Sequence, residues 1–129
     1  MFICKLRNRK QTIRYIMHEL SIATSIIKTA EKEVQDNGGE KVLEIYLEIG
    51  KLSGVEIQSL HFVWELSAKG TVLQDSKITI FEPEGRAKCA ECDTEFVLEK
   101  IYDSCPECKS PFKNILSGKE LKIKKLIIN

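Results

Sequence analysis

Two Cys-x-x-Cys pairs constrain this chain more than any other feature of its sequence. The pairs are CAEC at residues 89–92 and CPEC at residues 105–108, with twelve residues between them. Two residues between cysteines let a tight turn point both sulfurs at one ion, and two such turns complete a tetrahedron of thiolates. Four thiolates favour zinc, whose filled d shell accepts that geometry without redox chemistry. The spacing therefore predicts a zinc site at Cys89, Cys92, Cys105 and Cys108, with disulfides as the alternative.

The segment that carries these cysteines, residues 85–117, has little apolar content of its own. So short a module cannot build a sufficient hydrophobic core and needs a metal or disulfide staple. Because protein sulfur fills all four positions, no place is left for water or substrate, and the zinc is expected to be structural. The segment holds five basic and six acidic residues, a balance that argues against nucleic-acid binding.

Charge divides the chain just before Met17. Residues 1–16 carry five basic residues and no acid, whereas the remainder carries 15 basic and 19 acidic residues. We expect residues 1–16 to be a disordered extension, with Cys4 as a free thiol. They lack the apolar core of a signal peptide, and the chain has no apolar run of the roughly 18 residues that a membrane span needs. A cytoplasmic protein without a membrane segment is the simplest expectation.

Apolar periodicity predicts two helices. From Glu19 onward an apolar stripe at steps of three and four residues predicts a helix that ends at Asn37-Gly38-Gly39, with Leu20, Ala23, Ile27, Ala30 and Val34 on one face. Ser53 and Glu56 fit a capping box, in which the serine hydroxyl accepts from the third amide of the helix and the Glu56 carboxylate accepts from the amide of Ser53. A second helix should follow, with Ile57, Leu60, Val63 and Trp64 on one face.

Three strands are also expected in this part of the chain. In KVLEIYLEIG (41–50), Leu43, Ile45, Leu47 and Ile49 alternate with polar residues, which indicates a strand buried on one face. KITIFEP (77–83) reads as a short strand ended by Pro83. The C-terminal ELKIKKLIIN (120–129) reads as another, with its lysines on a solvated face or edge.

The tripeptide Met17-His18-Glu19 is a second candidate metal site. If the chain began at Met17, the terminal amine, the His18 imidazole and the amide between them would offer the nitrogen ligands that divalent nickel and copper accept in square-planar geometry. The Glu19 carboxylate could add an oxygen. The same residues also suit an ordinary helix start, with Glu19 at the positive end of the helix dipole.

Taken together, these motifs resemble the HypA/HybF family of nickel metallochaperones for NiFe-hydrogenase maturation. The resemblance rests on MHELSIATSII from Met17, on LEIGKLSGVEIQSLHFVWELSAKGT, and on the two cysteine pairs placed before ELKIKKL. It covers residues 17–129 in order. It implies an α+β fold, in which a small mixed α/β domain (17–84 plus 118–129) has two helices on a three-stranded sheet. The zinc-binding domain (85–117) is inserted before the last strand.

The resemblance also implies sites and partners. Nickel would be bound by the terminal amine of Met17, the His18 imidazole and neighbouring backbone nitrogens, with Glu19 assisting. In some members a further acid follows the first strand, and the aligned residue here is Glu56, which is one methylene longer and has a capping duty. The zinc ligands map onto the four cysteines. A HypB-type GTPase and the large subunit of NiFe-hydrogenase would be the partners, and no catalysis is implied; urease is a client of some relatives.

Residues 1–16 depart from the family pattern. If they stay attached, Met17 offers an amide instead of an amine, and nickel affinity should fall. We expect an upstream start codon or added sequence that the working chain lacks; a basic tail for an acidic partner is the alternative.

A zinc-ribbon interaction module or regulator without nickel chemistry is the alternative function. No phosphate loop or nucleophile–base arrangement indicates an enzyme, and His61 is expected on a helix surface.

Overall fold

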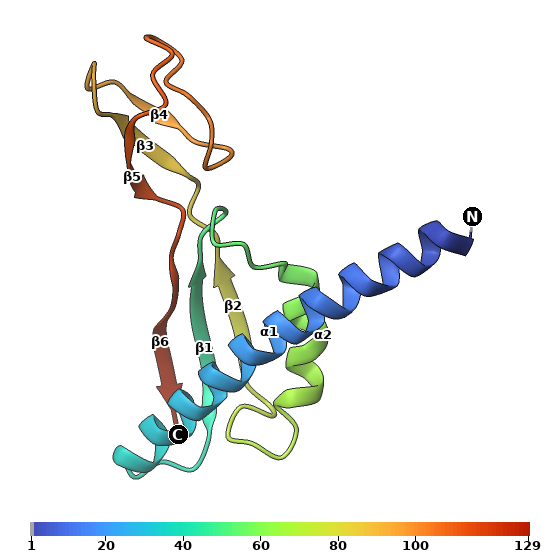
Figure 1. The fold of residues 1–129 in the computed structure, drawn as a ribbon. Helices are drawn as coiled ribbons and strands as arrows, with labels where there is room; N and C mark the ends of the chain where they lie inside the picture. The colour runs from blue at the N-terminus through green and yellow to red at the C-terminus, as the bar shows by residue number, and fades with distance from the viewer. Residues whose placement is uncertain (1) are drawn as a thin grey trace. The chain divides into compact units, whose positions relative to one another are not determined.

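The computed structural model describes the chain from Phe2 to Asn129, with side chains described from Met17 onward. In this range the elements follow the order α1 (Phe2–Asp36), β1 (Val42–Ile49), α2 (Ile57–Ser67), β2 (Lys77–Phe81), β3 (Arg86–Cys89), β4 (Glu95–Val97), β5 (Lys113–Ser117) and β6 (Leu121–Ile128) (Figure 1). Cys4, expected to be a free thiol, lies outside the described side chains. That expectation and the disorder expected for residues 1–16 stay predictions. No helix in the described part of the chain combines the length and apolar character that a bilayer crossing requires.

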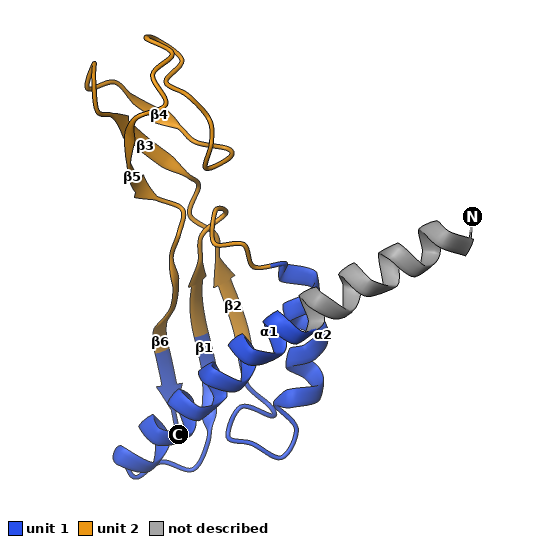
Figure 2. Ribbon diagram, in the orientation of Figure 1, with its two compact units in different colours: residues 1–45, 56–77, 126–129 blue, residues 46–55, 78–125 orange. Residues whose placement is uncertain are grey.

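The strands form two sheets of three, and their order confirms the predicted α+β fold. The first sheet has the spatial order β2-β1-β6 and the second has the order β4-β3-β5. In the sequence, the second sheet lies between β2 and β6, so the cysteine-bearing module precedes the final strand as expected. The chain divides into two compact units, residues 1–45, 56–77 and 126–129, and residues 46–55 and 78–125 (Figure 2). The functional domains expected at 17–84 plus 118–129 and at 85–117 stay predictions.

The core of the first unit lies where one face of α1 packs against one face of α2. α2 contributes the expected Leu60, Val63 and Trp64. The prediction for Leu20 is wrong, because this side chain is 43% exposed while its neighbour Glu19 is fully buried. Each residue turns an α-helix by about 100°, and this rotation places Glu19 closer than Leu20 to the middle of the buried face of α1. The buried stripe of α1 is Glu19, Ala23, Ile26, Ile27, Ala30 and Val34.

α1 ends as the sequence indicated, at a glycine in the left-handed region. Gly38 has φ +66°, and the amide of Gly39 donates to the carbonyl of Val34 over 2.9 Å. This bond satisfies a carbonyl of the last turn that has no partner within the helix. The chain can then turn directly into β1.

The capping box predicted between Ser53 and Glu56 is wrong. α2 begins at Ile57 with Glu56 as its N-cap, and the Glu56 carboxylate accepts from the amide of Gln58 over 2.9 Å. The Ser53 hydroxyl instead accepts from the amide of Val55 over 3.3 Å. Gly54 lies between them with φ +80°, a conformation that no helical residue adopts, so the helix cannot begin at Ser53.

β1 confirms the expected alternation except at its start. Ile45, Leu47 and Ile49 are buried, whereas Leu43 is 43% exposed and Val42 is buried in its place. The amide of Val42 donates to the carbonyl of Val72 over 2.9 Å. Because this bond ties the start of β1 to the loop after α2, Val42 is covered there and the two-residue period begins only at Ile45.

Three glycines allow close backbone contact at the base of the cysteine-bearing module, within the second unit. A Cβ on Gly50 would lie 2.0 Å from the carbonyl oxygen of Gly118, and one on Gly85 would lie 2.1 Å from that of Leu98. The amide of Leu52 donates to the Gly118 carbonyl over 2.7 Å. The Leu52 side chain then packs against the buried cluster of the module. The residues just after β1 thus complete the module's core.

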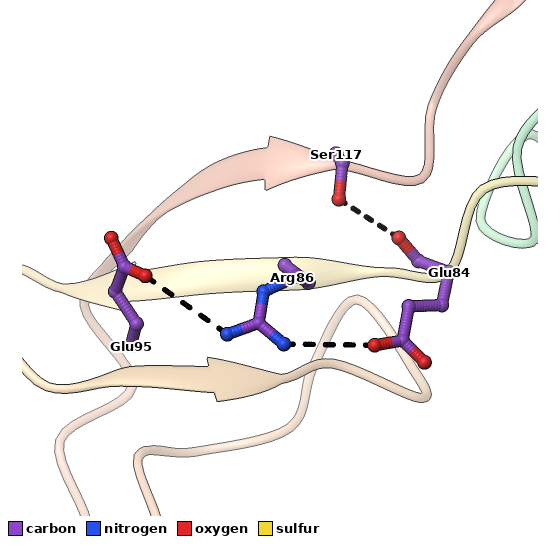
Figure 3. A network of polar contacts seen from close by, with 4 residues as sticks. All are labelled: Glu84, Arg86, Glu95 and Ser117. Atoms are coloured by element: carbon purple, nitrogen blue, oxygen red, sulfur yellow. Dashed lines mark hydrogen bonds and ion pairs between the residues drawn. The ribbon is translucent and has the colours of Figure 1, made fainter.

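A polar network beside β3 joins the two segments that connect the module to the rest of the chain. The Ser117 hydroxyl donates to the carbonyl of Glu84 over 2.8 Å, and Arg86 lies 3.6 Å from the Glu84 carboxylate and 3.9 Å from that of Glu95 (Figure 3). These side chains are about half exposed, so each ion pair contributes at most about 1 kcal/mol. Their main consequence is that the charge of Arg86 is neutralised by carboxylates.

The close contact at Gly50 predicts a loss of stability on adding a methyl group. We expect Gly50→Ala to lower the free energy of unfolding by about 3 kcal/mol, the upper end of the usual cost of overpacking, because the obstacle is backbone that cannot move aside. Gly70→Ala is the control: Gly70 has open space around it and φ +75°, so only the left-handed conformation is penalised, by about 1 kcal/mol. Urea unfolding of the zinc-loaded chain measures both. Equal losses would contradict the close contact.

Candidate metal centres

The four cysteine sulfurs converge on one point. All four Sγ atoms lie within 4.8 Å of one another, with 3.5 Å between Cys89 and Cys108 and 3.6 Å between Cys92 and Cys105. A tetrahedron with Zn–S bonds of about 2.3 Å has S···S edges of about 3.8 Å. The observed spacing is close to this value, so the four residues fit a single zinc ion.

The two cysteine pairs adopt the same backbone turn. In the first, the amide of Cys89 donates to Thr94 and the amide of Asp93 donates back to Cys89, over 2.9 and 3.1 Å. In the second, the amide of Cys105 donates to Ser110 and that of Lys109 donates back to Cys105, both over 2.9 Å. Asp93 and Lys109, which follow the second cysteine of each pair, have φ of 62° and 64°. This left-handed residue folds each turn back so that both sulfurs face the same side.

The module's buried cluster is small and includes two of these cysteines. It consists of Ala87, Cys89, Phe96, Leu98 and Cys105, with Leu52 and Ile115 packed against it. Cys92 and Cys108 are exposed on the outer side. Two of the five buried residues are thus thiols, and the apolar area alone offers little folding energy to so short a segment. A bound ion would join the inner and outer cysteines.

The surroundings of the two outer cysteines differ. The hydroxyl and the amide of Thr94 lower the pKa of Cys92 to about 6, so its thiolate is available at neutral pH. The amide of Ser110 lowers the pKa of Cys108, but the Cys89 sulfur and desolvation outweigh it and raise the value to about 12. A metal would therefore meet one ready thiolate and would have to displace the proton of another.

The Met17-His18-Glu19 segment lies inside α1, which begins upstream of it, so the expected position of Glu19 at a helix start is wrong. Met17 is 64% exposed and His18 is exposed, whereas Glu19 is fully buried. The exposed histidine is accessible to an ion from solvent, and the neighbouring carboxylate is not.

The structure brings Glu19 and Glu56 together. The backbone amide of Glu56 donates to Oε1 of Glu19 over 3.1 Å, although 37 positions separate the two residues. Oε2 of Glu19 is buried and has no hydrogen-bond partner among the described residues. The sequence had suggested both residues as ligands, but it gave no sign of this contact, because nothing local marks a buried glutamate as a partner for a distant amide.

The two candidate sites differ in how completely they are formed. Within the described residues, the four cysteines are the only group of three or more metal-binding side chains gathered at one point. His18 and the Glu56 carboxylate are exposed, and the Glu56 carboxylate caps α2. His61 lies exposed on α2, as expected. The described side chains around Met17 are therefore not gathered at one point as the cysteines are.

Comparisons with known proteins agree over this same range. The family model "Hydrogenase/urease nickel incorporation, metallochaperone, hypA" matches residues 17–128. The hydrogenase maturation factor HypA of Parabacteroides distasonis is 43% identical over 112 residues, which cover 87% of this chain and 97% of that protein. The corresponding factor of Francisella philomiragia is 39% identical over 113 residues, covering 88% and 100%.

Solved structures show the same fold. The solution structure of the Ni metallochaperone HypA from Helicobacter pylori aligns with a TM-score of 0.62 at 22% identity, covering 85% of this chain and 96% of that one. A second HypA solution structure aligns with a TM-score of 0.65 at 24% identity, covering 88% and 97%. These descriptions name a metallochaperone and maturation factor rather than an enzyme. With a family match from Met17 almost to the C-terminus and 43% identity to a curated relative, the chain belongs to the HypA family of hydrogenase maturation factors.

Proposed function

We propose that this protein binds Ni(II) at Met17-His18-Glu19 and, with a GTPase partner, delivers it to the large subunit of NiFe-hydrogenase. The observation that carries the proposal is that the family match begins at Met17, where His18 is exposed beside a buried acid. An exposed imidazole with few fixed neighbours suits an ion that must be released. A carrier needs such an open site, unlike a closed tetrahedron of sulfurs.

The nickel ligands would come from His18 and the backbone around it. In a chain that begins at Met17, the amides of His18 and Glu19 have no carbonyl four residues upstream, so these nitrogens and the imidazole would supply donors of the kind that square-planar nickel accepts. A chain beginning at Met17 would add its terminal amine, whereas residues 1–16 would replace that amine by an amide. We therefore expect the working protein to begin at Met17.

Glu19 assists this site from a buried position. Its Oε1 accepts from the amide of Glu56, which fixes the start of α2 beside the helix that bears His18. The Glu56 carboxylate is exposed and could turn from its capping bond toward an ion. The geometry supports a role for Glu19 in holding the segment and a role for Glu56 as an oxygen ligand.

The zinc site has a different task. We infer that Cys89, Cys92, Cys105 and Cys108 hold a structural zinc, since their spacing and donor type fit the ion and leave no ligand position open. Zinc bound there would supply most of the folding energy of the module, on the order of 10–16 kcal/mol.

The proposed partners are a HypB-type GTPase and the hydrogenase large subunit, in the cytoplasm. Urease is an alternative client, because the family description names both enzymes. The pairing of Arg86 with two carboxylates supports the expectation that nucleic acid is not a partner. A zinc-ribbon interaction module without nickel chemistry remains the alternative function, and nickel binding separates the two.

The nickel assignment predicts the effect of His18→Ala in a chain that begins at Met17. Nickel affinity should fall by more than about 100-fold, beyond the loss typical of residues that only support a ligand, because a ligand itself is removed. Isothermal titration with Ni(II) measures the affinity, and zinc content should stay at one ion per chain. His61→Ala is the control, since His61 is the other histidine and is exposed on α2. Undiminished nickel binding by His18→Ala would refute the assignment.

The buried contact of Glu19 predicts different results for two substitutions. Glu19→Gln retains a carbonyl oxygen for the Glu56 amide and should keep nickel affinity within a few-fold of wild type. Glu19→Ala leaves that amide unpaired and opens a cavity, which should cost about 2–4 kcal/mol of stability and weaken nickel binding. Thermal unfolding and nickel titration measure both effects. An equally large loss of nickel affinity in both variants would instead identify Glu19 as a ligand.

The structural zinc predicts that the module unfolds without metal. Cys105→Ser, which removes a buried sulfur, should lose zinc and collapse the amide chemical-shift dispersion of residues 85–117. An excess of a strong chelator should have the same effect on the wild type. Cys4→Ser is the matched control and should retain one zinc per chain. A dispersed spectrum for the zinc-free wild-type module would show that metal is not what folds it.

A further inference from the structure

An open hollow on the first sheet has an aromatic and basic lining. Its volume is about 380 Å³, and it is lined by Tyr46, Leu47, Thr79, Phe81, Lys124 and Lys125. These residues come from β1, β2 and β6, the three strands of that sheet (Figure 1), and all belong to the second unit. None of them belongs to either metal site. The hollow therefore has no part in the proposed metal binding.

Two lysines of the hollow stand over aromatic rings. Nζ of Lys124 lies 5.7 Å from the centroid of Phe81, and Nζ of Lys125 lies 5.5 Å from that of Tyr46. A ring face attracts an ammonium group without accepting conventional hydrogen bonds from it, so the N–H donors of the lysine stay available to a carboxylate. Lys122 on the same strand differs, because it forms an ion pair with Glu48 over 3.2 Å. Lys124 and Lys125 thus offer two positive charges held in position over the rings of Phe81 and Tyr46.

Apolar surface accompanies these charges. The Phe81 side chain is 56% exposed although it lies in a strand. Aromatic side chains are enriched in the buried centres of protein interfaces, where they contribute much of the binding energy. The lining contains two lysines and no acid, so its charge complements an acidic occupant.

We propose that this hollow binds an extended peptide segment of a partner protein in which a large apolar side chain is flanked by carboxylates. The apolar side chain packs against Phe81 and Tyr46, and the carboxylates accept from the ammonium groups of Lys124 and Lys125. This docking surface goes beyond the proposed metal transfer and is independent of which metal is bound.

Nucleic acid would also use rings and lysines, but the charge distribution favours a peptide. A bound strand requires several basic groups along its phosphates, whereas residues 17–129 carry 15 basic against 19 acidic residues. The hollow itself offers only two such groups, Lys124 and Lys125, which is enough for two carboxylates but not for a run of phosphates.

Amide chemical shifts of the ¹⁵N-labelled, zinc-loaded full chain test the proposal. The probe is the capped synthetic peptide Asp-Glu-Phe-Leu-Asp-Glu, and its matched control replaces each acid by lysine. We expect saturable shifts at Tyr46, Thr79, Phe81, Lys124 and Lys125 with the acidic peptide alone. Lys124→Glu should weaken binding at least about tenfold, which corresponds to about 1.4 kcal/mol.

Two protein variants complete the design. Phe81→Ala should also weaken binding, while Lys77→Glu, with the same charge change on β2 outside the hollow, should bind like the wild type. Retained zinc and unchanged dispersion elsewhere establish that each variant is folded. Absence of localised shifts at millimolar peptide, or an equal loss in Lys77→Glu, would overturn the proposal. Stronger shifts of the same amides with hexathymidine would overturn it in favour of nucleic acid.

Discussion

Convergence of four cysteine sulfurs within 4.8 Å is the constraint on which the second unit depends. The buried cluster around them has five residues, and two of these are themselves cysteines. Removing the ion would leave thiols at the centre of a core too small to fold alone. Two turns with identical hydrogen bonds and a left-handed residue prepare the sulfurs, so the backbone is arranged for a tetrahedral ion, and under the proposed zinc assignment that ion would in turn hold the backbone.

The Met17-His18-Glu19 segment follows an opposite physical logic. Its histidine is exposed, and its one buried polar group, Glu19, is engaged with the backbone of Glu56 rather than with other ligands. A site built in this way offers an ion few fixed donors and an open path to solvent. Under the proposed function, exchange would follow from that openness, just as retention would follow from the closed sulfur site. The same small chain would then keep one metal and pass on another.

Local patterns predicted most of the fold, and the errors lie where distant segments meet. The cysteine spacing, the glycine end of α1 and the apolar face of α2 depend on neighbours in sequence. The burial of Glu19 depends on an amide 37 positions away, and the start of α2 on the conformation of Gly54. Leu43 is exposed and Val42 is buried where the Val42 amide bonds to the loop after α2. Apolar periodicity does not record such contacts, so the burial of Glu19 and its contact with Glu56 could not be predicted.

The close contact between Gly50 and Gly118 ties the end of β1 to the cysteine-bearing module more tightly than a flexible linker would. Leu52 follows β1 by three positions, yet it packs against the cluster that contains Cys89 and Cys105. Its amide donates to Gly118, and that of Lys51 donates to Pro83 over 3.0 Å. A fragment limited to residues 85–117 would lack this side chain and these bonds. Under the proposed zinc assignment, the ion would then have to organise an incomplete core, so the ion and the end of β1 would act on the same folding step.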